Sequence, residues 1–253
     1  MRLKNKTAFI TGAASGIGRT TALRFADEGA LIYALDIDEA GLKSLISEIR
    51  KKGGKAECLK CDVSNESSVR AAVTNALKLY GKIDVLVNVA GIQITKSLVN
   101  TSWEDYKKMM DINMGGTFLT MNMILPIMKE AGCGAIVNVA SELAIVGYPE
   151  LAAYTATKGA MVAMSRSASL EAIKYGVRIN CVCPGATDTP IFWEGETDPN
   201  KMQKMLDQVA IEKPIGRLIT TDEVASGVVF LASDEASGVV GTCLVIDGGF
   251  TAQ

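Results

Sequence analysis

Tyr154 and Lys158 stand four residues apart in an alanine-rich part of the chain, and their side chains are a candidate acid–base pair. Alanine is the strongest helix former, so a helix is expected here, and a spacing of four places both side chains on one helix face. A free tyrosine has a pKa of about 10, and a neighbouring ammonium lowers it by favouring the phenolate. Because the chain has no histidine, the usual proton shuttle near neutral pH is missing. The same spacing also occurs by chance in many helices, so the pair needs support from the rest of the chain.

Two polar side chains stand at the ends of predicted strands. Ser141 follows the apolar run Ala135–Ala140, where its hydroxyl could donate a hydrogen bond to a substrate oxygen. Asp36 ends the run Leu31–Asp36, where a carboxylate could accept hydrogen bonds from ribose hydroxyls. The alternative for Asp36 is an exposed strand-end aspartate that binds no ligand.

A glycine-rich turn, Thr11–Gly18, joins the first predicted strand to the first predicted helix. Its glycines allow a tight turn, and the start of the helix offers N–H donors and a positive dipole to a pyrophosphate. The spacing is G-x-x-x-G-x-G, which differs from the common G-x-G-x-x-G dinucleotide fingerprint. Glycine also marks ordinary turns, but the flanking strand and helix and the acid after the second strand favour phosphate binding.

The elements that must position these residues alternate along the chain. Apolar, strand-like runs are Lys6–Thr11, Leu31–Asp36, Lys55–Lys60, Ile83–Val89, Ile136–Ala140, Arg178–Cys183 and Thr242–Ile246. Helical patterns are Gly16–Glu28, Asp38–Lys51, Glu66–Tyr80, Trp103–Ala131, Ala152–Tyr175 and Thr221–Ala232. Near-continuous apolar strands separated by helices predict a parallel sheet covered on both faces. The fold class is therefore α/β, a Rossmann-like doubly wound sheet of about seven strands in one domain spanning residues 1–253.

The composition narrows the class of protein. Hydrophobic residues make up 48%, and the formal net charge of −2 offers no basic surface for nucleic acid. No apolar run reaches the length of roughly 18 residues that would span a bilayer, and we expect no signal peptide. Cys58-x-x-Cys61 invites a redox or zinc interpretation, but no second pair and no histidine complete a site. We expect no metal and reduced structural thiols in the cytoplasm.

Six ordered motifs closely resemble those of the short-chain dehydrogenase/reductase family, in its single-domain type, over essentially the whole chain. They are the loop Thr11–Gly18, Asn88-Val-Ala-Gly91, Asn113, the set Ser141, Tyr154 and Lys158, the segment Pro184–Thr189, and Asp247-Gly-Gly249. The family more often has two consecutive asparagines at the second motif.

The resemblance implies roles for these residues. Tyr154 is the general acid or base, Lys158 lowers its pKa and holds the nicotinamide ribose, Ser141 holds the substrate oxygen, and Asn113 binds a water that relays protons. A helix-interior asparagine bonded to a backbone carbonyl is the alternative for Asn113. Asn88 fits better a tie between neighbouring strands, and Asp62 is either an adenine contact or a helix cap. The implied cofactor-binding residues are Gly12, Ser15, Gly16, Ile17, Gly18, Asp36, Asp62, Val63, Asn88, Ala90, Gly91, Tyr154, Lys158, Pro184, Gly185, Thr187 and Thr189.

The expected cofactor is NAD. NADP carries a 2′-phosphate where Asp36 is expected, and two anions at hydrogen-bonding distance repel each other. Ile37 offers no compensating charge, and Arg19 is expected on the outer face of its helix. A preference for NAD of at least about tenfold follows, which needs only about 1.4 kcal/mol.

The substrate is expected to be a neutral, fairly apolar secondary alcohol or its ketone, cyclic or steroid-like. The segment from about residue 187 to 213 is expected to be a lid, with Met202, Met205, Leu206 and Val209 at helical spacing over the substrate or packed on the domain. The substrate-contacting residues implied by position are Gln93, Ser141, Leu143, Tyr148 and Tyr154, with Ile94, Glu142 and Val146 nearby. Charges near the entrance are mainly negative in this interpretation.

Two other functions stay open, a 3-oxoacyl thioester reductase and a dinucleotide-binding protein without catalysis. The helical stretches Trp103–Ala131 and Ala152–Tyr175 carry more apolar residues than one buried face needs. Relatives use these helices for assembly, so we expect a homotetramer whose only other partner is a small-molecule alcohol or ketone.

Overall fold

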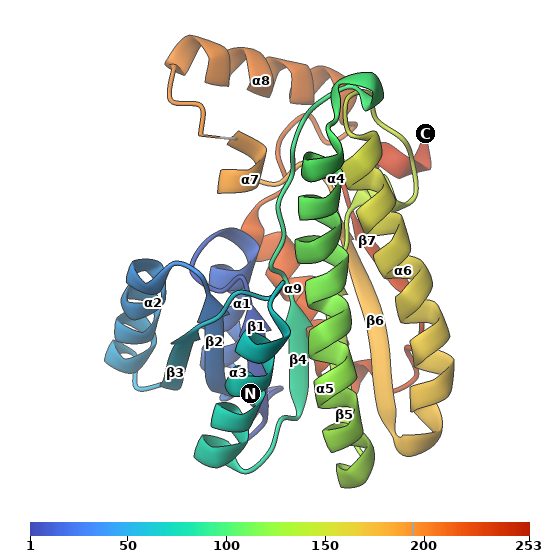
Figure 1. Cartoon of the computed structure of the whole chain (residues 1–253). Coiled ribbons are helices and arrows are strands. Elements are labelled where there is room, and N and C mark those ends of the chain that lie inside the picture. The colour runs from blue at the N-terminus through green and yellow to red at the C-terminus, as the bar shows by residue number, and fades with distance from the viewer. Residues whose placement is uncertain (194) are drawn as a thin grey trace.

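Seven parallel strands form one sheet in the computed structural model, which describes residues 1–193 and 195–253 (Figure 1). The strands are β1 (Thr7–Thr11), β2 (Leu31–Asp36), β3 (Lys55–Lys60), β4 (Val85–Asn88), β5 (Gly134–Val139), β6 (Val177–Pro184) and β7 (Cys243–Ile246). Their order across the sheet is β3-β2-β1-β4-β5-β6-β7, and every pairing is parallel. The predicted doubly wound sheet of about seven strands is confirmed.

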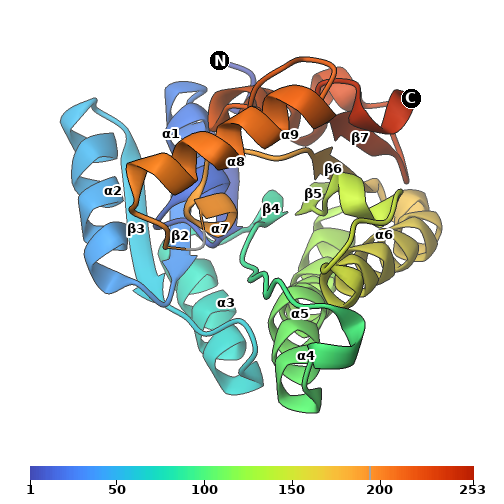
Figure 2. The ribbon, with the colours of Figure 1, turned by 90° about the horizontal axis from the view of Figure 1, so that it is seen from above.

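Helices cover both faces of the sheet (Figure 2). They are α1 (Gly16–Asp27), α2 (Glu39–Lys51), α3 (Glu66–Tyr80), α4 (Trp103–Met109), α5 (Gly116–Ala131), α6 (Ala152–Ala172), α7 (Pro190–Trp193), α8 (Pro199–Glu212) and α9 (Thr221–Ala232). In β1, Ala8 and Ile10 pack into one core with α1, α2 and α9, while Phe9 packs into the other with α3 and α5. Successive strand residues face opposite sides of the sheet, so a continuously apolar strand contributes side chains to both cores.

The strand order reverses beside β1, which pairs with β2 on one side and β4 on the other. Chain connections therefore diverge from the carboxyl ends of β1 and β4, and a crevice opens between them. In open α/β sheets, ligands bind in this crevice.

A polar network crosses the middle of the sheet. Asn88 at the end of β4 donates to Asn138 of β5 at 2.8 Å and accepts from Thr120 of α5 at 2.7 Å. Asn138 in turn donates to Ser165 of α6 at 2.8 Å. Each of these four side chains is buried, and each finds a partner in the others. The network fixes β4, β5 and two covering helices relative to one another.

Two predicted elements differ from the structure. The helix predicted over Trp103–Ala131 is interrupted by a π-helical turn, Met110–Gly115, between α4 and α5, although Pro126 is accommodated inside α5. Single π turns are often found at functional sites. The strand predicted over Ile83–Val89 is regular only as β4, because the chain turns after it and the N–H groups of Val89 and Ala90 both donate to the Thr11 hydroxyl.

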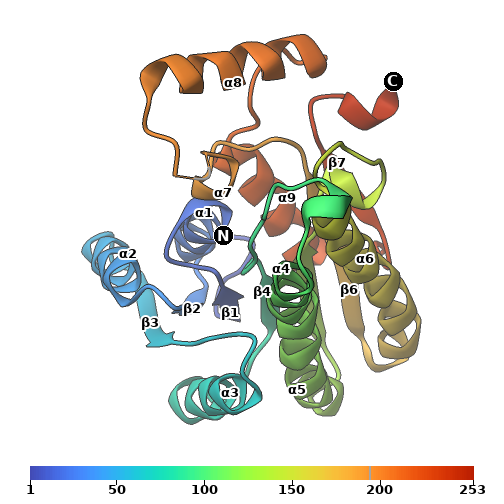
Figure 3. The same ribbon diagram turned by 45° about the horizontal axis from the view of Figure 1, so that its top comes forward.

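The segment after β6 contains the two helices α7 and α8, and α8 lies across the top of the molecule (Figure 3). Asp198 caps α8 through the Asn200 N–H, and Pro199 occupies its first turn, where no intrahelical donor is needed. Glu194, in this segment, lies outside the described residues. Within the described residues, no helix is both long enough and apolar enough to cross a membrane.

Candidate active site

A cavity of about 1150 Å³ opens at the carboxyl edge of the sheet, below α7 and α8. Most of the residues predicted for the site line it. They are Gly12, Ser15, Gly16, Ile17, Asp36, Asp62, Val63, Ala90, Gly91, Gln93, Ser141, Leu143, Tyr148, Tyr154, Lys158, Pro184, Gly185, Thr187 and Thr189. Gly18, Asn88 and Asn113 do not line the cavity and lie behind its wall.

The glycine-rich turn forms one end of the cavity. Gly12 and Gly16 have φ of +65° and +49°, which favour glycine, and a β-carbon on Gly12 would lie 2.7 Å from the Ala90 nitrogen. Helix α1 begins at Gly16, and Ser15 before it makes no side-chain cap, so the first N–H groups of the helix face the cavity without a capping oxygen. A β-carbon on Gly18 would lie 2.0 Å from the Gly12 carbonyl oxygen, which gives Gly18 a role in closing the turn. This cradle fits a pyrophosphate group.

Asp36, the last residue of β2, lines the cavity beside the glycine-rich turn. Its carboxylate accepts from the backbone N–H groups of Ala14 and Asp38, each at 3.0 Å, and is thereby held in place. Arg19, the first base after the glycine-rich turn, pairs with Glu48 of the neighbouring helix α2 at 2.7 Å. A carboxylate held in this way can accept hydrogen bonds from ribose hydroxyls.

The cavity wall also includes Asp62 and Val63. Asp62 accepts from both the N–H and the hydroxyl of Ser64, whereas Asn65, and not Asp62, caps α3. The capping alternative for Asp62 is therefore wrong. Asn88 serves as the predicted tie between strands.

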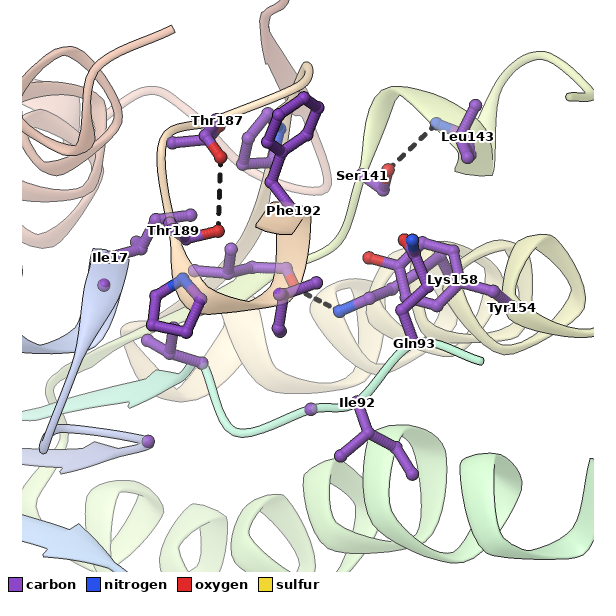
Figure 4. A pocket seen from close by; sticks show the side chains of 18 of the residues that line it. Ile17, Ile92, Gln93, Ser141, Leu143, Tyr154, Lys158, Thr187, Thr189 and Phe192 are labelled. Carbon is purple, nitrogen blue, oxygen red and sulfur yellow. Dashed lines mark hydrogen bonds between the residues drawn. The ribbon is translucent and has the colours of Figure 1, made fainter. Parts of the chain in front are cut away.

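Ser141, Tyr154 and Lys158 meet at the inner end of the cavity (Figure 4). Tyr154 and Lys158 lie one turn apart on α6, with the ammonium 5.7 Å from the centre of the phenol ring. Lys158 donates to the Val139 carbonyl at 2.9 Å, which anchors it beneath the site. Ser141 begins the loop after β5, where its hydroxyl accepts from the Leu143 N–H at 3.1 Å.

Burial dominates the electrostatics of this group. It raises the pKa of Tyr154 to about 12, with the Ser141 hydroxyl acting in the opposite direction, and it lowers the pKa of Lys158 to about 8. The predicted lowering of the phenol pKa below its ordinary value is not found in this structure, because burial of the phenol is the largest effect and raises the pKa. Tyr154 therefore holds its proton at neutral pH.

Asn113 lies in the π-helical turn and is completely buried. Its amide donates to the Ile92 carbonyl at 2.9 Å and to Thr157, and its carbonyl accepts from the Ile92 N–H at 2.8 Å. The alternative of an asparagine bonded to backbone describes these contacts. They join the π-helical turn and α6 to the loop after β4, and Gly91 in this loop lies close to both Asn113 and Lys158.

The loop after β6 closes the cavity opposite Tyr154. Thr187 donates to the Gly185 carbonyl at 2.8 Å. Thr189 donates to the Thr187 carbonyl at 3.2 Å (Figure 4). A β-carbon on Gly185 would lie 2.8 Å from the Asp247 α-carbon, so this position has no room for a side chain.

Helix α8 forms the outer wall, but only part of its predicted apolar stripe faces the cavity. Met205 and Val209 line it, whereas Met202 and Leu206 do not, and neither do Ile94 and Val146. The sequence interpretation missed several charged wall residues, which are of both signs. These residues are Glu104, Lys107, Lys108, Asp111, Lys204, Glu212 and Lys213. The four-residue spacing of Met205 and Val209 also predicts Glu212 and Lys213 on the same side of the last turn, a signal that was available in the sequence.

Two contacts connect α8 with the loop after Ser141. Tyr148 donates to the Glu212 carboxylate at 2.8 Å, and Lys213 forms a buried ion pair with Glu142 at 2.5 Å. The six cysteines are free thiols, and the described residues contain no group of three or more histidine, cysteine or acidic side chains arranged to hold a metal.

Comparison with known proteins finds reductases and dehydrogenases that are similar to the chain over nearly its whole length. A family model described as enoyl-(acyl carrier protein) reductase matches residues 12–251. A 3-oxoacyl-(acyl-carrier-protein) reductase of Thermotoga maritima is 38% identical over 98% of this chain and 99% of its own length. Cyclopentanol dehydrogenase of Comamonas testosteroni is 37% identical over 100% and 99%. The crystal structure of levodione reductase superposes with a TM-score of 0.95 at 34% identity and covers 99% of both chains.

These relatives are similar to the chain over its full length and share its fold. Their family binds nicotinamide dinucleotides, which agrees with the cradle at the start of α1 and the catalytic group at the inner end of the cavity. The chain belongs to the short-chain dehydrogenase/reductase family.

Proposed function

We propose that the protein is an NAD-dependent oxidoreductase that interconverts a secondary alcohol and its ketone. One observation carries the proposal: Ser141, Tyr154 and Lys158 line the same cavity as the pyrophosphate cradle and Asp36. Bound NAD supplies the hydride acceptor at its nicotinamide ring. The chain's own residues then have to hold the alcohol oxygen and move its proton.

Ser141 holds the substrate oxygen and Tyr154 exchanges its proton. Because the Tyr154 phenol is protonated near neutral pH, it is prepared to donate to a carbonyl oxygen in the direction of reduction. In the direction of oxidation the phenol must first lose this proton, and the Lys158 ammonium stabilises the resulting negative charge. Asn113 keeps the floor of the site in place through its contacts with Ile92.

The substrate is a neutral, fairly apolar alcohol, cyclic or steroid-like. Leu143, Leu151 and Met205 contribute apolar wall near the catalytic group. The similarity to cyclopentanol dehydrogenase and levodione reductase supports a cyclic substrate.

A 3-oxoacyl thioester reductase is the second candidate. Lys107, Lys108 and Lys204 line the outer part of the cavity, where they would attract the phosphate of a carrier. Lys107 is partly neutralised by Asp111 at 3.4 Å. The 38% identity with the Thermotoga maritima enzyme also favours this candidate.

A turnover assay distinguishes the candidates. With NAD, we expect cyclic alcohols or hydroxysteroids to be oxidised with a higher kcat/KM than hydroxy acids or 3-hydroxyacyl thioesters. The Tyr154→Phe variant should lose about 10²–10⁴-fold in kcat while binding NADH as the wild type does. If the variant keeps its activity, the assigned mechanism is wrong. If 3-hydroxyacyl thioesters are oxidised with a much higher kcat/KM than the cyclic alcohols, the second candidate replaces the first.

A further inference from the structure

Ser141 is held in the cavity by the short turn that follows it. Glu142–Ala144 form one turn of 3-10 helix, and the Leu143 N–H donates to the Ser141 hydroxyl at 3.1 Å. The N–H of Ala144 donates to the Ser141 carbonyl at 3.0 Å. The position of the Ser141 hydroxyl therefore depends on where this turn is held.

Two side chains of the turn anchor it. Leu143 packs with Tyr154 and Met109 in a buried apolar cluster. The Glu142 carboxylate accepts from the Lys213 ammonium at 2.5 Å, and each of these two side chains is only 6% exposed. Within the described residues, the second carboxylate oxygen of Glu142 has no hydrogen-bond partner, so Lys213 is the donor that holds this side chain.

Lys213 is itself fixed in place. It follows the last residue of α8, and its ammonium lies 3.2 Å from the centre of the Phe250 ring. Two residues further on, the Ile215 N–H donates to the Gly248 carbonyl at 3.1 Å. The end of α8 is thus fastened to the segment after β7, and from there Lys213 reaches the turn after Ser141.

We propose that Lys213 is a positioning residue for the reaction, which by holding Glu142 keeps in place the turn that presents the Ser141 hydroxyl. This inference rests on the proposed function, in which Ser141 holds the substrate oxygen. Because α8 forms the outer wall of the cavity, the placement of this wall and the placement of Ser141 are coupled. Neither Lys213 nor Glu142 has to touch the substrate.

The charges of the pair give the inference a signature in the pH dependence. The titratable groups that interact electrostatically with Glu142 are Lys213, Asp247, Glu212, Tyr148 and Tyr154. Burial raises the pKa of the Glu142 carboxyl group, the two acids add to this effect, and Lys213 opposes it. Without Lys213 the pKa of Glu142 rises further. The carboxyl group is then neutral at low pH, whereas at higher pH it becomes an uncompensated buried charge.

The double variant Glu142→Met/Lys213→Met tests the inference in the reduction of a cyclic ketone by NADH. It replaces the pair by apolar side chains of similar length, so no buried charge is left and the protein should fold. We expect kcat per NADH-binding site to fall about tenfold or more, because the Ser141 turn is no longer held, with KM for NADH changed by less than about twofold. A merely structural role would reduce the number of NADH-binding sites and leave kcat per site unchanged, which overturns the inference.

Lys213→Met alone leaves the carboxyl group in place and tests the role of charge. Its kcat should match that of the double variant at pH 5 and fall below it as the pH rises to 8 and Glu142 ionises. A ratio of the two kcat values that does not change with pH would overturn the inference. Lys201→Met is the matched control, because it removes an exposed ammonium of α8 that pairs with Glu196 at 3.1 Å. It should keep the wild-type kcat at both pH values.

Hydrogen exchange separates this inference from the proposed function, because it needs no turnover. The backbone N–H groups of residues 143–146 donate within the turn, so this segment should exchange about tenfold faster in the double variant than in the wild type or Lys201→Met. If the wild type reduces no ketone but exchange in the double variant is faster, the function falls and the role of Lys213 in holding the turn stands. If the wild type is active and the double variant keeps its kcat, the function stands and the inference falls, whatever the exchange rate.

Discussion

Lys158 is a cation that the fold removes almost completely from water. Its ammonium donates to the Val139 carbonyl, and burial lowers its pKa to about 8 from an ordinary value of 10.5. The charged form is thus less stable in the folded protein than in the unfolded chain. The proposed catalytic role of Lys158 therefore comes at a cost in stability, which is common at functional sites.

This cost should depend on pH. Between about pH 8 and 10.5 the unfolded chain binds more protons at Lys158 than the folded protein, so the contribution of Lys158 to stability rises with pH. The variant Lys158→Met lacks this contribution. From pH 7 to pH 10, the free energy of unfolding of the wild type should improve relative to the variant by about 2 kcal/mol. Urea unfolding at both pH values measures this difference, and a constant difference would contradict the assignment.

Asp36 should decide between the two nicotinamide cofactors. Its carboxylate is fixed by two backbone N–H groups, and Arg19 is engaged with Glu48. We expect kcat/KM for NAD to exceed that for NADP by about tenfold or more. Asp36→Ala should reduce the ratio mainly by improving NADP. Equal kcat/KM for the two cofactors in the wild type would refute the role of Asp36.

At the scale of elements, the glycine-rich turn depends on backbone contact between Gly12 and Gly18. A methyl group on Gly18 would lie 2.0 Å from the Gly12 carbonyl oxygen, so the turn must open or α1 must shift. Gly18→Ala should destabilise the protein by about 1–3 kcal/mol and weaken NADH binding. Gly238→Ala is the control, because that glycine is exposed and a methyl group there would have no atom within 4 Å. Similar melting temperatures and NADH affinities for both variants would show that the contact is unimportant.

The elements that the sequence predicted well are those whose pattern is local. Each of the seven strands and the pyrophosphate turn follows from a short apolar run or from glycine spacing. The π-helical turn at Met110–Gly115 could not be predicted in this way, because it depends on Asn113 reaching Ile92 from another part of the chain. The pairing of Glu142 with Lys213 joins residues 71 positions apart, so no local pattern reveals it.

The tyrosine pKa shows the same limit at the site itself. The four-residue spacing correctly places Tyr154 and Lys158 on one face of α6. It carries no information on burial, which depends on the elements that surround α6 and which sets the direction of the shift.

At the scale of the whole molecule, α5 and α6 lie side by side (Figure 1). Both helices expose large apolar side chains. Phe118 and Leu170 are the clearest cases, and 75% of Leu170 is exposed. We propose that these helices form an interface in a homotetramer. Light scattering at micromolar concentration should give a tetrameric mass, and Leu170→Glu should reduce it. Leu79→Glu, on α3, is the control and should leave the mass unchanged, whereas a monomeric wild type would refute the proposal.

The polar network at the centre of the sheet limits which substitutions this sequence can accept during evolution. Asn88, Asn138, Thr120 and Ser165 satisfy one another, so replacing one of them alone leaves a buried donor or acceptor without a partner. The stability losses of Asn88→Leu and Asn138→Leu, added together, should therefore exceed the loss in the double variant by about 0.5–3 kcal/mol in urea unfolding. Strict additivity would show that the positions vary independently. With such coupling, changes at these positions are accepted jointly, and two lineages with different networks could not exchange single residues here without loss of stability.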